Sequence, residues 1–205
     1  MMKLADKIVK KVRRRPPGTV FSPKDFVGLG GAGAVYKALS RLVVEGKLRR
    51  IGRGLYDRPP VSRLVDGPVP ASLEAVLEAV RRKTNAVIVP DHAAAANAMG
   101  LTTALPVRPV FLANKELKAI RIGSRTIRFK AAGRVLLPWL ERPAAPIVQS
   151  LLWLREEGFP VHDAAAIIRR RASTRAKNDL DRHIRLLPAW MIPVAQEITR
   201  KAATG

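Results

Sequence analysis

The chain has 205 residues, of which 47% are hydrophobic, and it contains no cysteine. This length and apolar content suffice for one or two folded domains and exclude disorder throughout, while the lack of cysteine excludes disulfides, thiolate metal sites and a cysteine nucleophile. The 38 lysines and arginines outnumber the 16 aspartates and glutamates, so the formal net charge is +22 and favours a polyanionic partner.

Half of this net charge lies in the first 58 residues, which contain 15 basic and 4 acidic residues, a difference of +11. A membrane surface is the competing polyanion. However, the sequence has no apolar run of about 18 residues, and its start lacks the apolar segment of a secretion signal. We therefore expect a cytoplasmic protein that binds nucleic acid and does not bind a membrane.

Residues 2–13 are predicted to form a first helix. Its apolar residues recur at the spacing of one helical face: Ala5, Ile8, Val9 and Val12. Arg13, Arg14 and Arg15 follow, and Pro16-Pro17-Gly18 ends the helix. Residues 19–21 are then expected to be extended.

A second, short helix is predicted to begin after Ser22, because serine is a favoured N-cap and Pro23 fits the first helical position. Glycine-rich residues 28–33 form the turn into a third helix over 34–45. The apolar face of that helix is Val35, Ala38, Leu39, Leu42 and Val43. Gly46 stands where a left-handed residue commonly ends a helix.

A basic hairpin with its tip at Gly52-Arg53-Gly54 follows the third helix directly. The order of helix, short strand, helix, turn, helix and hairpin is that of a winged helix-turn-helix. Such a module places its last helix in the major groove of DNA while the hairpin, called the wing, grips phosphate. The alternative is an ordinary amphipathic helix packed on an ordinary hairpin, with its charges merely solvated.

The winged-helix interpretation predicts which side chains contact DNA. Arg41 is expected to bond a guanine edge with two hydrogen bonds, and Lys37 to reach a base or a phosphate. The groove-facing set is Tyr36, Lys37, Ser40 and Arg41. The set expected on phosphate or in the neighbouring minor groove is Lys47, Arg49, Arg50 and Arg53, and Arg13, Arg14 and Arg15 are expected to add backbone contacts.

The remainder of the chain is predicted to give the protein a mixed α/β (α+β) fold. A proline-rich linker over 59–70 separates the winged helix of residues 1–58 from an α+β domain over 71–160. Helices are expected at 72–83, capped by Ser72, at 92–99, capped by Asp91, and from Pro146 to Gly158. Strands are expected at 86–89, 107–113, 117–122 and 125–131. Trp139 and Trp153 are expected in the core or at an interface.

Residues 161–205 are predicted to form a helical C-terminal extension, with helices at 163–171, 176–187 and 189–203. The extension holds 9 basic and 4 acidic residues. It is compatible with a second nucleic-acid contact, with a partner-binding helical pair or with a solvated cap. Its many apolar residues, such as Trp190 and Met191, favour partner or dimer contacts.

Residues 18–59 resemble the N-terminal winged helix of the AbiEi-type antitoxins of abortive-infection, type IV toxin–antitoxin systems. The resemblance is carried by Phe26 and residues 38–42, 45–48 and 51–56, and it continues through 87–90, 94–97, Gly100-Leu101 and Leu105-Pro106. It implies a transcriptional repressor of its own operon, whose part after the linker counteracts a toxin of the nucleotidyltransferase class. Winged-helix repressors commonly read paired half-sites, so a homodimer is compatible with this function.

An enzyme is the rival class of function, and the sequence offers little for one. The glycines of residues 28–33 precede no Gly-Lys-Ser/Thr, and they do not follow a buried strand as a dinucleotide fingerprint would. His92, His162 and His183 lie far apart, and acidic residues form no cluster. We therefore predict no catalytic residue, no cofactor and no metal. An RNA-binding or protein-interaction role for the same winged helix is the remaining alternative.

Overall fold

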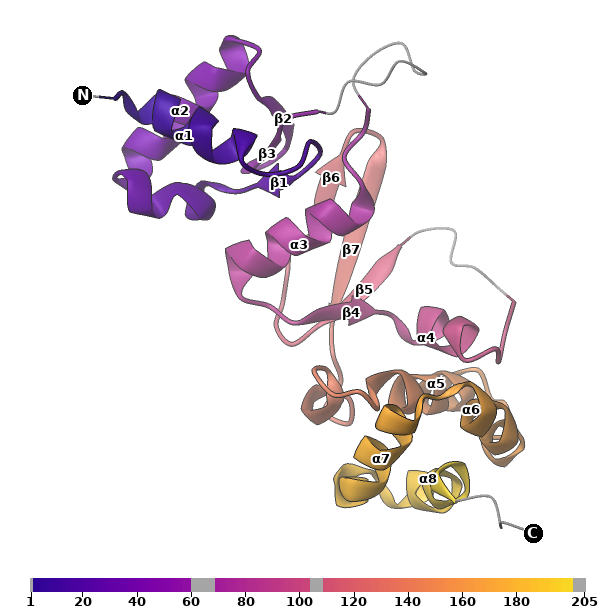
Figure 1. Cartoon of the computed structure of the whole chain (residues 1–205). Helices are drawn as coiled ribbons and strands as arrows, with labels where there is room; N and C mark the ends of the chain where they lie inside the picture. Colours follow the sequence, from indigo (N-terminus) through magenta and orange to yellow (C-terminus); the bar gives the residue numbers. More distant parts are fainter. Residues whose placement is uncertain (1, 60–68, 104–108, 201–205) are drawn as a thin grey trace. The chain divides into compact units, whose positions relative to one another are not determined.

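The computed structural model describes residues 2–59, 69–103 and 109–200. It is a mixed α/β (α+β) protein with two small sheets and a helical C-terminal part (Figure 1). The chain divides into two compact units, Met1–Ala86 with Ile120–Thr126, and Val87–Ala119 with Ile127–Gly205. Among the described residues, no helix combines the length and the apolar character needed to cross a bilayer.

The elements of the first unit follow in the predicted order: α1 (Leu4–Arg13), β1 (Val20–Phe21), the 3-10 helix η1 (Pro23–Leu29), α2 (Ala32–Val44), β2 (Arg49–Gly52), β3 (Leu55–Asp57) and α3 (Leu73–Thr84). The second helix is thus a 3-10 helix, and the side chain and backbone of Ser22 both bond Asp25 at its start. The helix α2 begins two residues before the predicted start, because Gly31 rather than Gly33 is its N-cap.

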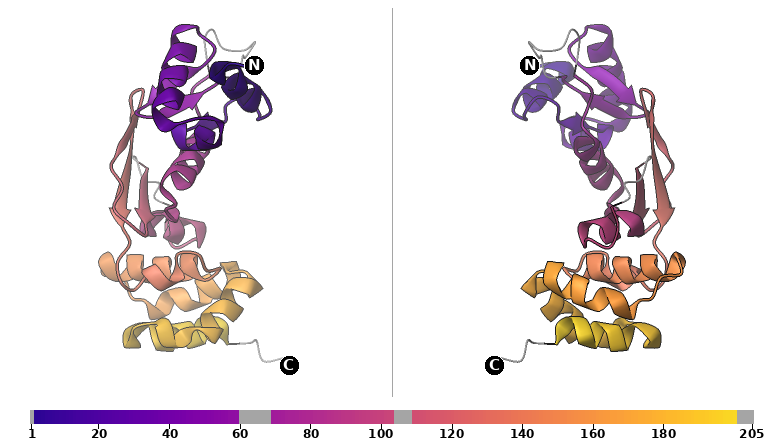
Figure 2. Two further views of the ribbon diagram at one scale, coloured as in Figure 1. Left: turned by 90° about the vertical axis from the view of Figure 1, so that its left-hand side faces the viewer. Right: turned by 90° about the vertical axis from the view of Figure 1, so that its right-hand side faces the viewer.

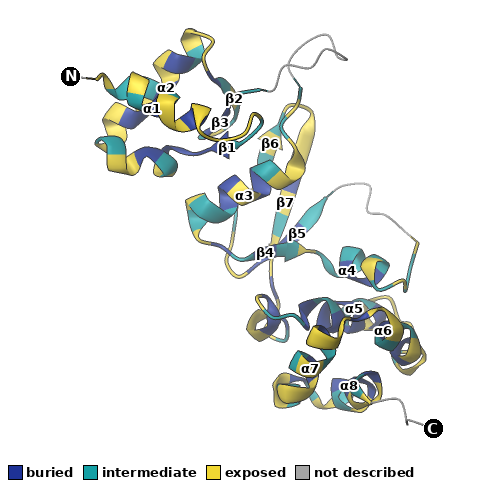
Figure 3. Cartoon of the chain, in the orientation of Figure 1, coloured by how far each residue is buried: buried dark blue, intermediate teal, exposed yellow. Residues whose placement is uncertain are grey.

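The core of the first unit consists of the predicted apolar faces of α1 and α2 closed by η1 (Figure 3). Ile8, Phe26, Val35 and Leu39 have no exposed surface, and Leu42 is 1% exposed. Burying a side chain of this size contributes roughly 1.5–3 kcal/mol. The chain leaves α2 through Gly46, whose φ of 66° confirms the left-handed residue expected there.

A three-stranded sheet of order β1-β3-β2 completes this module. Both pairings of β3 are antiparallel, with Val20 and Arg49 both opposite Asp57 on its two sides. The register shifts by one residue between Arg50 and Gly52, which makes a bulge next to the hairpin tip.

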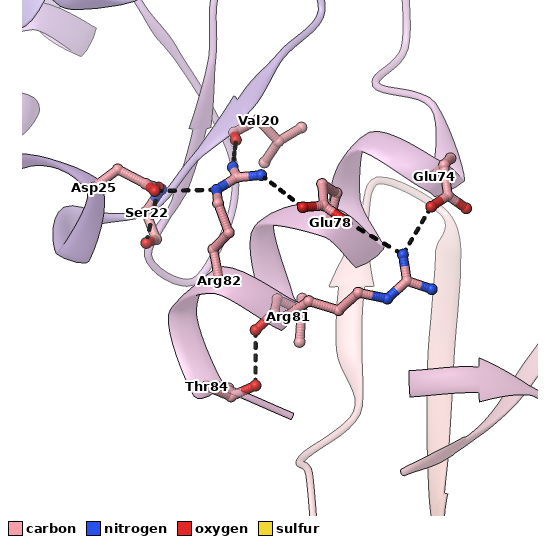
Figure 4. Close-up of polar contacts among 9 residues, drawn as sticks. Val20, Ser22, Asp25, Glu74, Glu78, Arg81, Arg82 and Thr84 are labelled. Carbon is pink, nitrogen blue, oxygen red and sulfur yellow. Dashed lines mark hydrogen bonds and ion pairs between the residues drawn. The ribbon is translucent and has the colours of Figure 1, made fainter. Parts of the chain in front are cut away.

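The helix α3 is bonded to the elements that precede it, although the sequence predicted a separation at 59–70. Figure 4 shows the guanidinium of Arg82 donating to the Val20 carbonyl at 2.7 Å and to Asp25 at 3.1 Å. Lys24 donates to the Asn85 side chain at 2.9 Å. The two units consequently divide after Ala86, and residues 60–68 of the predicted linker lie outside the described residues.

The second sheet has the strand order β4-β5-β7-β6, from β4 (Ile88–Pro90), β5 (Val110–Ala113), β6 (Ile120–Ile122) and β7 (Arg125–Ala131). β5 pairs antiparallel with β4 and parallel with β7.

The helix α4 (His92–Ala98) is capped by the Asp91 side chain, which accepts from the Ala94 amide at 3.0 Å and confirms the predicted cap. Ser72 caps α3 in the same way. Residues 104–108, which include part of the predicted strand 107–113, are not described.

The C-terminal part of the second unit is a stack of helices (Figure 2): α5 (Ala145–Glu156), α6 (Ala165–Arg171), α7 (Thr174–Arg182) and α8 (Ile192–Thr199), with short 3-10 helices at Leu137–Trp139, His162–Ala164, Ile184–Leu186 and Ala189–Met191. Trp139, Ile147 and Leu180 are fully buried in its core. The predicted helices 176–187 and 189–203 are wrong in extent. Ser173 caps a helix that ends at Arg182, and Pro188 separates two 3-10 turns.

Candidate nucleic-acid interface

The outer face of α2 presents the four side chains predicted to read DNA bases. Tyr36, Lys37, Ser40 and Arg41 are all exposed, and Tyr36 retains 50% of its surface. They lie one or two positions beyond the fully buried Val35 and Leu39 on the helix, so the apolar face fixes which way they point. A helix held by one face and polar on the other has the form needed to enter a groove.

An ion-pair chain runs from α2 toward the wing. Glu45 accepts from Arg41 Nε at 2.8 Å, one helical turn away, and its second oxygen lies 2.8 Å from Lys47 Nζ. Hydrogen bonds from Lys47 and then from Arg41 lower the pKa of Glu45 below its usual value of 4.5. Glu45 is therefore ionised at neutral pH and engages two of the cations that were predicted to bind DNA.

Arg49 has a different environment from the other predicted contact residues. Its guanidinium donates to both carboxylate oxygens of Asp57, at 3.0 and 2.6 Å, and to the Val69 carbonyl at 2.9 Å. The Asp57 side chain has no exposed surface. Arg49 is thus the partner of a buried charge. The sequence contained a signal for this pairing, since a hairpin with its tip at residues 52–54 places residue 49 opposite 57.

Arg50 and Arg53 point into solvent from the wing. Arg50 Nε donates to the Gly52 carbonyl at 3.5 Å, and the Arg53 carbonyl accepts from Lys83 at 3.5 Å. Neither guanidinium forms an ion pair with any residue that the structure describes. Their positive charge is therefore available to a phosphate.

Arg13, Arg14 and Arg15 are exposed at the C-terminal end of α1. Within the described parts of the chain they have no carboxylate at ion-pair distance. All eleven predicted contact residues belong to the first unit, and ten of them are exposed, the exception being Arg49. The structure thus brings a polar helix face and a group of uncompensated cations into one compact body.

The sequence analysis missed one basic segment of the first unit, the turn between β6 and β7. An ideal Cβ placed on Gly52 would lie 3.1 Å from the carbonyl oxygen of Arg121, so the wing backbone and this turn approach each other closely. Arg121 and Arg125 are both exposed. No local pattern indicates a contact between residues almost 70 positions apart, and the approach could not be predicted from the sequence.

Two of the histidines, His92 and His183, take part in side-chain interactions within the second unit. His92 lies 3.1 Å from Glu156, and His183 contacts the Asp179 side chain at 3.1 Å and Arg142 at 3.1 Å. In residues 2–59, 69–103 and 109–200, no group of three or more His, Asp or Glu side chains is arranged to hold a metal ion.

Comparison with known proteins gives one match. No curated protein and no solved structure matches the chain. Residues 7–158, well over half of the chain, match the model of a protein family described as a family of unknown function, DUF6088. The match begins within α1 and extends past the end of α5, so it includes both small sheets. The chain therefore belongs to the DUF6088 family.

Proposed function

We propose that the first unit contains a winged helix that binds double-stranded DNA, and that the protein is a sequence-specific transcriptional regulator. The observation that supports this most strongly is the pairing of an exposed polar face on α2 with the uncompensated cations of the wing. The net charge of +11 in residues 1–58 supplies the long-range attraction to a polyanion.

In this proposal α2 enters the major groove and Arg41 bonds a guanine edge. Arg41 must first leave Glu45, but this ion pair is exposed to solvent, which weakens it. A bidentate arginine–guanine contact discriminates by about 1–3 kcal/mol, so the exchange favours DNA that offers a guanine at this position.

Arg50, Arg53 and the run Arg13-Arg14-Arg15 bind phosphate in this proposal and set the register of the protein on the duplex. Arg49 is left out of the contact surface, because removing it from Asp57 would leave a carboxylate with no exposed surface unpaired. Its role is to hold β2 on β3, and thereby to position Arg50 and Arg53.

The proposal is tested by a salt-titrated binding assay of the full chain on the DNA upstream of its own gene. Random duplex and tRNA serve as competitors. A regulator is expected to retain its target at an excess of random duplex, and its affinity is expected to fall steeply with salt. Equal displacement by every polyanion would refute sequence-specific regulation, and preferential displacement by tRNA would assign the winged helix to RNA.

The resemblance to AbiEi-type antitoxins supports a narrower proposal, that the regulator represses its own operon as an antitoxin. The part of the chain after residue 70 would then counteract a nucleotidyltransferase-like toxin, and a homodimer would read paired half-sites. Co-expression with any nucleotidyltransferase-like protein encoded next to this gene tests the proposal. Growth arrest by that protein should be relieved by this chain and persist without it. Arrest that the chain does not relieve would remove the antitoxin role and leave the DNA-binding proposal intact.

A further inference from the structure

An open cleft of about 430 Å³ lies within the first unit, between the wing strand β2 and the turn that joins β6 to β7. Residues of β2 form one side, and Ile122, Ser124 and Arg125 form the other. The two sides come from segments that are far apart in the sequence. The wing was expected to bind phosphate by itself, whereas here a second basic segment faces it.

The charge of this cleft is positive and largely uncompensated. Arg49, Arg50 and Arg125 are among its lining residues, and none of the lining residues that the structure describes is an aspartate or a glutamate. Arg49 is neutralised by Asp57, which leaves Arg50 and Arg125. Both are exposed, and neither forms an ion pair within the described parts of the chain. A concave surface with two free guanidinium groups concentrates positive potential more than either group would on a convex surface.

A close backbone contact, and not a long side chain, sets the distance between the two sides. The Cβ position of Gly52 lies 3.1 Å from the Arg121 carbonyl oxygen and 3.9 Å from Ile120 Cγ2. A side chain at residue 52 would therefore require the backbone of β6 at Arg121 to move by a few tenths of an ångström. Arg121 Nε donates to the Gly123 carbonyl at 3.3 Å, which holds the turn in a compact form without neutralising the guanidinium.

We propose that this cleft binds a phosphate of the DNA backbone, held by Arg50 from the wing and Arg125 from the β6–β7 turn. This inference rests on the proposed DNA-binding function and adds a contact that lies outside the winged helix itself. A backbone phosphate suits the cleft better than a free anion, because the two available arginines are exposed to water. A small free anion would need several buried donors, whereas a polyanion gains from releasing its counterions at exposed cations.

The test is Arg125→Gln in the full chain, with duplex affinity measured over a range of salt concentrations. Loss of one phosphate contact should lower the slope of log K against log [salt] by about one. The matched control is Arg128→Gln, which removes an exposed arginine of the same strand that does not line the cleft. Its slope should equal that of the wild type. Equal slopes for wild type and Arg125→Gln, or equal losses in both variants, would overturn the proposal.

A second variant changes the geometry and leaves the charge unaltered. Gly52→Ala should move the Arg121 backbone away from β2 by a few tenths of an ångström and lower the slope by less than Arg125→Gln does. Gly28→Ala is its control, because nothing lies within 4 Å of a Cβ at residue 28. Thermal unfolding of each variant shows whether it folds. If Gly52→Ala does not fold, Arg125→Gln alone decides the test.

Two further measurements distinguish failure of the cleft proposal from failure of the proposed DNA-binding function. If the wild type binds no duplex in a salt-dependent way, the DNA-binding function itself fails. If Arg53→Ala lowers the slope but Arg125→Gln does not, the wing binds DNA and only the cleft proposal fails. Inorganic phosphate at constant ionic strength tests the other source of the ligand. Stabilisation by phosphate that requires Arg125, together with an unchanged DNA slope, would assign the cleft to a free anion and overturn the DNA contact.

Discussion

Glu45 lies on the proposed DNA-contact surface and pairs with two of its cations, Arg41 and Lys47. The ion pairs to Arg41 and Lys47 exist in the free protein, above the lowered pKa of Glu45, and are lost as the pH falls through that value. At neutral pH Glu45 therefore competes with DNA for both cations. A carboxylate on a DNA-binding face lowers the affinity for every DNA sequence. It lowers most the affinity for sequences that offer Arg41 no contact strong enough to replace its ion pair with Glu45.

Arg41→Ala is expected to relax sequence preference. If Arg41 bonds one guanine, the variant should lose about 1–3 kcal/mol of discrimination at a single base pair and little elsewhere. The measurement is binding of wild type and variant to a set of target duplexes that differ by one base pair each. Arg53→Ala provides the comparison, because a phosphate contact should weaken all of these duplexes alike. A uniform loss for Arg41→Ala would contradict its base-reading role.

Glu45→Gln is expected to raise duplex affinity at neutral pH. The substitution removes a negative charge from the contact surface and frees Arg41 and Lys47, while the amide keeps the size of the side chain. Glu74→Gln is the control, since Glu74 also pairs with an arginine, at 2.8 Å, but lies on α3. Affinity should rise in the first variant only. A decrease in Glu45→Gln would show that Glu45 orients Arg41 for binding instead of competing with DNA.

Arg49 and Arg50 are neighbours in sequence, but their substitution should change different properties. Substitution of Arg49 should lower stability, whereas substitution of Arg50 should lower the salt dependence of DNA binding. Arg49→Ala leaves Asp57, which has no exposed surface, without its partner, and should lower the free energy of unfolding by about 3–5 kcal/mol. Arg50→Ala should change it by roughly 0.5 kcal/mol or less, as at other exposed sites, and should lower the salt dependence of DNA binding. Chemical denaturation measures the first effect. Similar stabilities of the two variants would remove the structural role of Arg49.

At the scale of elements, α3 is joined to the first module through charged side chains. Arg82 bonds Val20 of β1 and Asp25 of η1, and it also pairs with Glu78 of α3 (Figure 4). Arg81, its neighbour, instead pairs with Glu74 and Glu78 on the same helix. Because Arg82 bonds β1 and η1, α3 belongs to the first unit, although the sequence predicted a domain boundary before it, at residues 59–70.

Arg82→Ala should weaken the attachment of α3 to β1 and η1. Losing hydrogen bonds from a charged group to Val20 and Asp25 is expected to cost about 1.5–3 kcal/mol. Hydrogen exchange of the α3 amides should accelerate accordingly. Arg81→Ala should have a smaller effect, because its ion pairs with Glu74 and Glu78 are to exposed carboxylates and contribute about 0–1 kcal/mol each. Equal acceleration in both variants would show that the interactions within α3 matter more.

The elements whose residues interact locally could be predicted from the sequence. The face of α2 follows from Val35, Leu39 and Leu42 at helical spacing, and Ser72 and Asp91 are caps because their side chains reach an amide three residues later. Contacts between distant segments could not be predicted. The bond from Arg82 to Val20 and the approach of Gly52 to Arg121 depend on packing of segments about 60 to 70 residues apart, and neither leaves a periodic pattern.

At the scale of the whole molecule, the net charge of +22 does not by itself locate a binding surface. Two runs of three arginines occur, at residues 13–15 after α1 and at residues 169–171 at the end of α6. Both stand at the C-terminal end of a helix, where positive charge is favourable for the helix dipole by about 0.3–1 kcal/mol each. The two runs thus carry the same charge near a helix C-terminus, and differ in the unit to which they belong.

Replacing each run of three arginines by three glutamines shows whether DNA binding depends on a localised surface or on the net charge of the chain. If the first unit carries the DNA contacts, the 13–15 variant should reduce the slope of log K against log [salt] by up to about three, and the 169–171 variant should leave it unchanged. Both variants lower the net charge by the same amount and should lose similar, small amounts of stability. Equal reductions in slope would mean that DNA responds to the total charge of the chain, and that the first unit confers no localised contact surface.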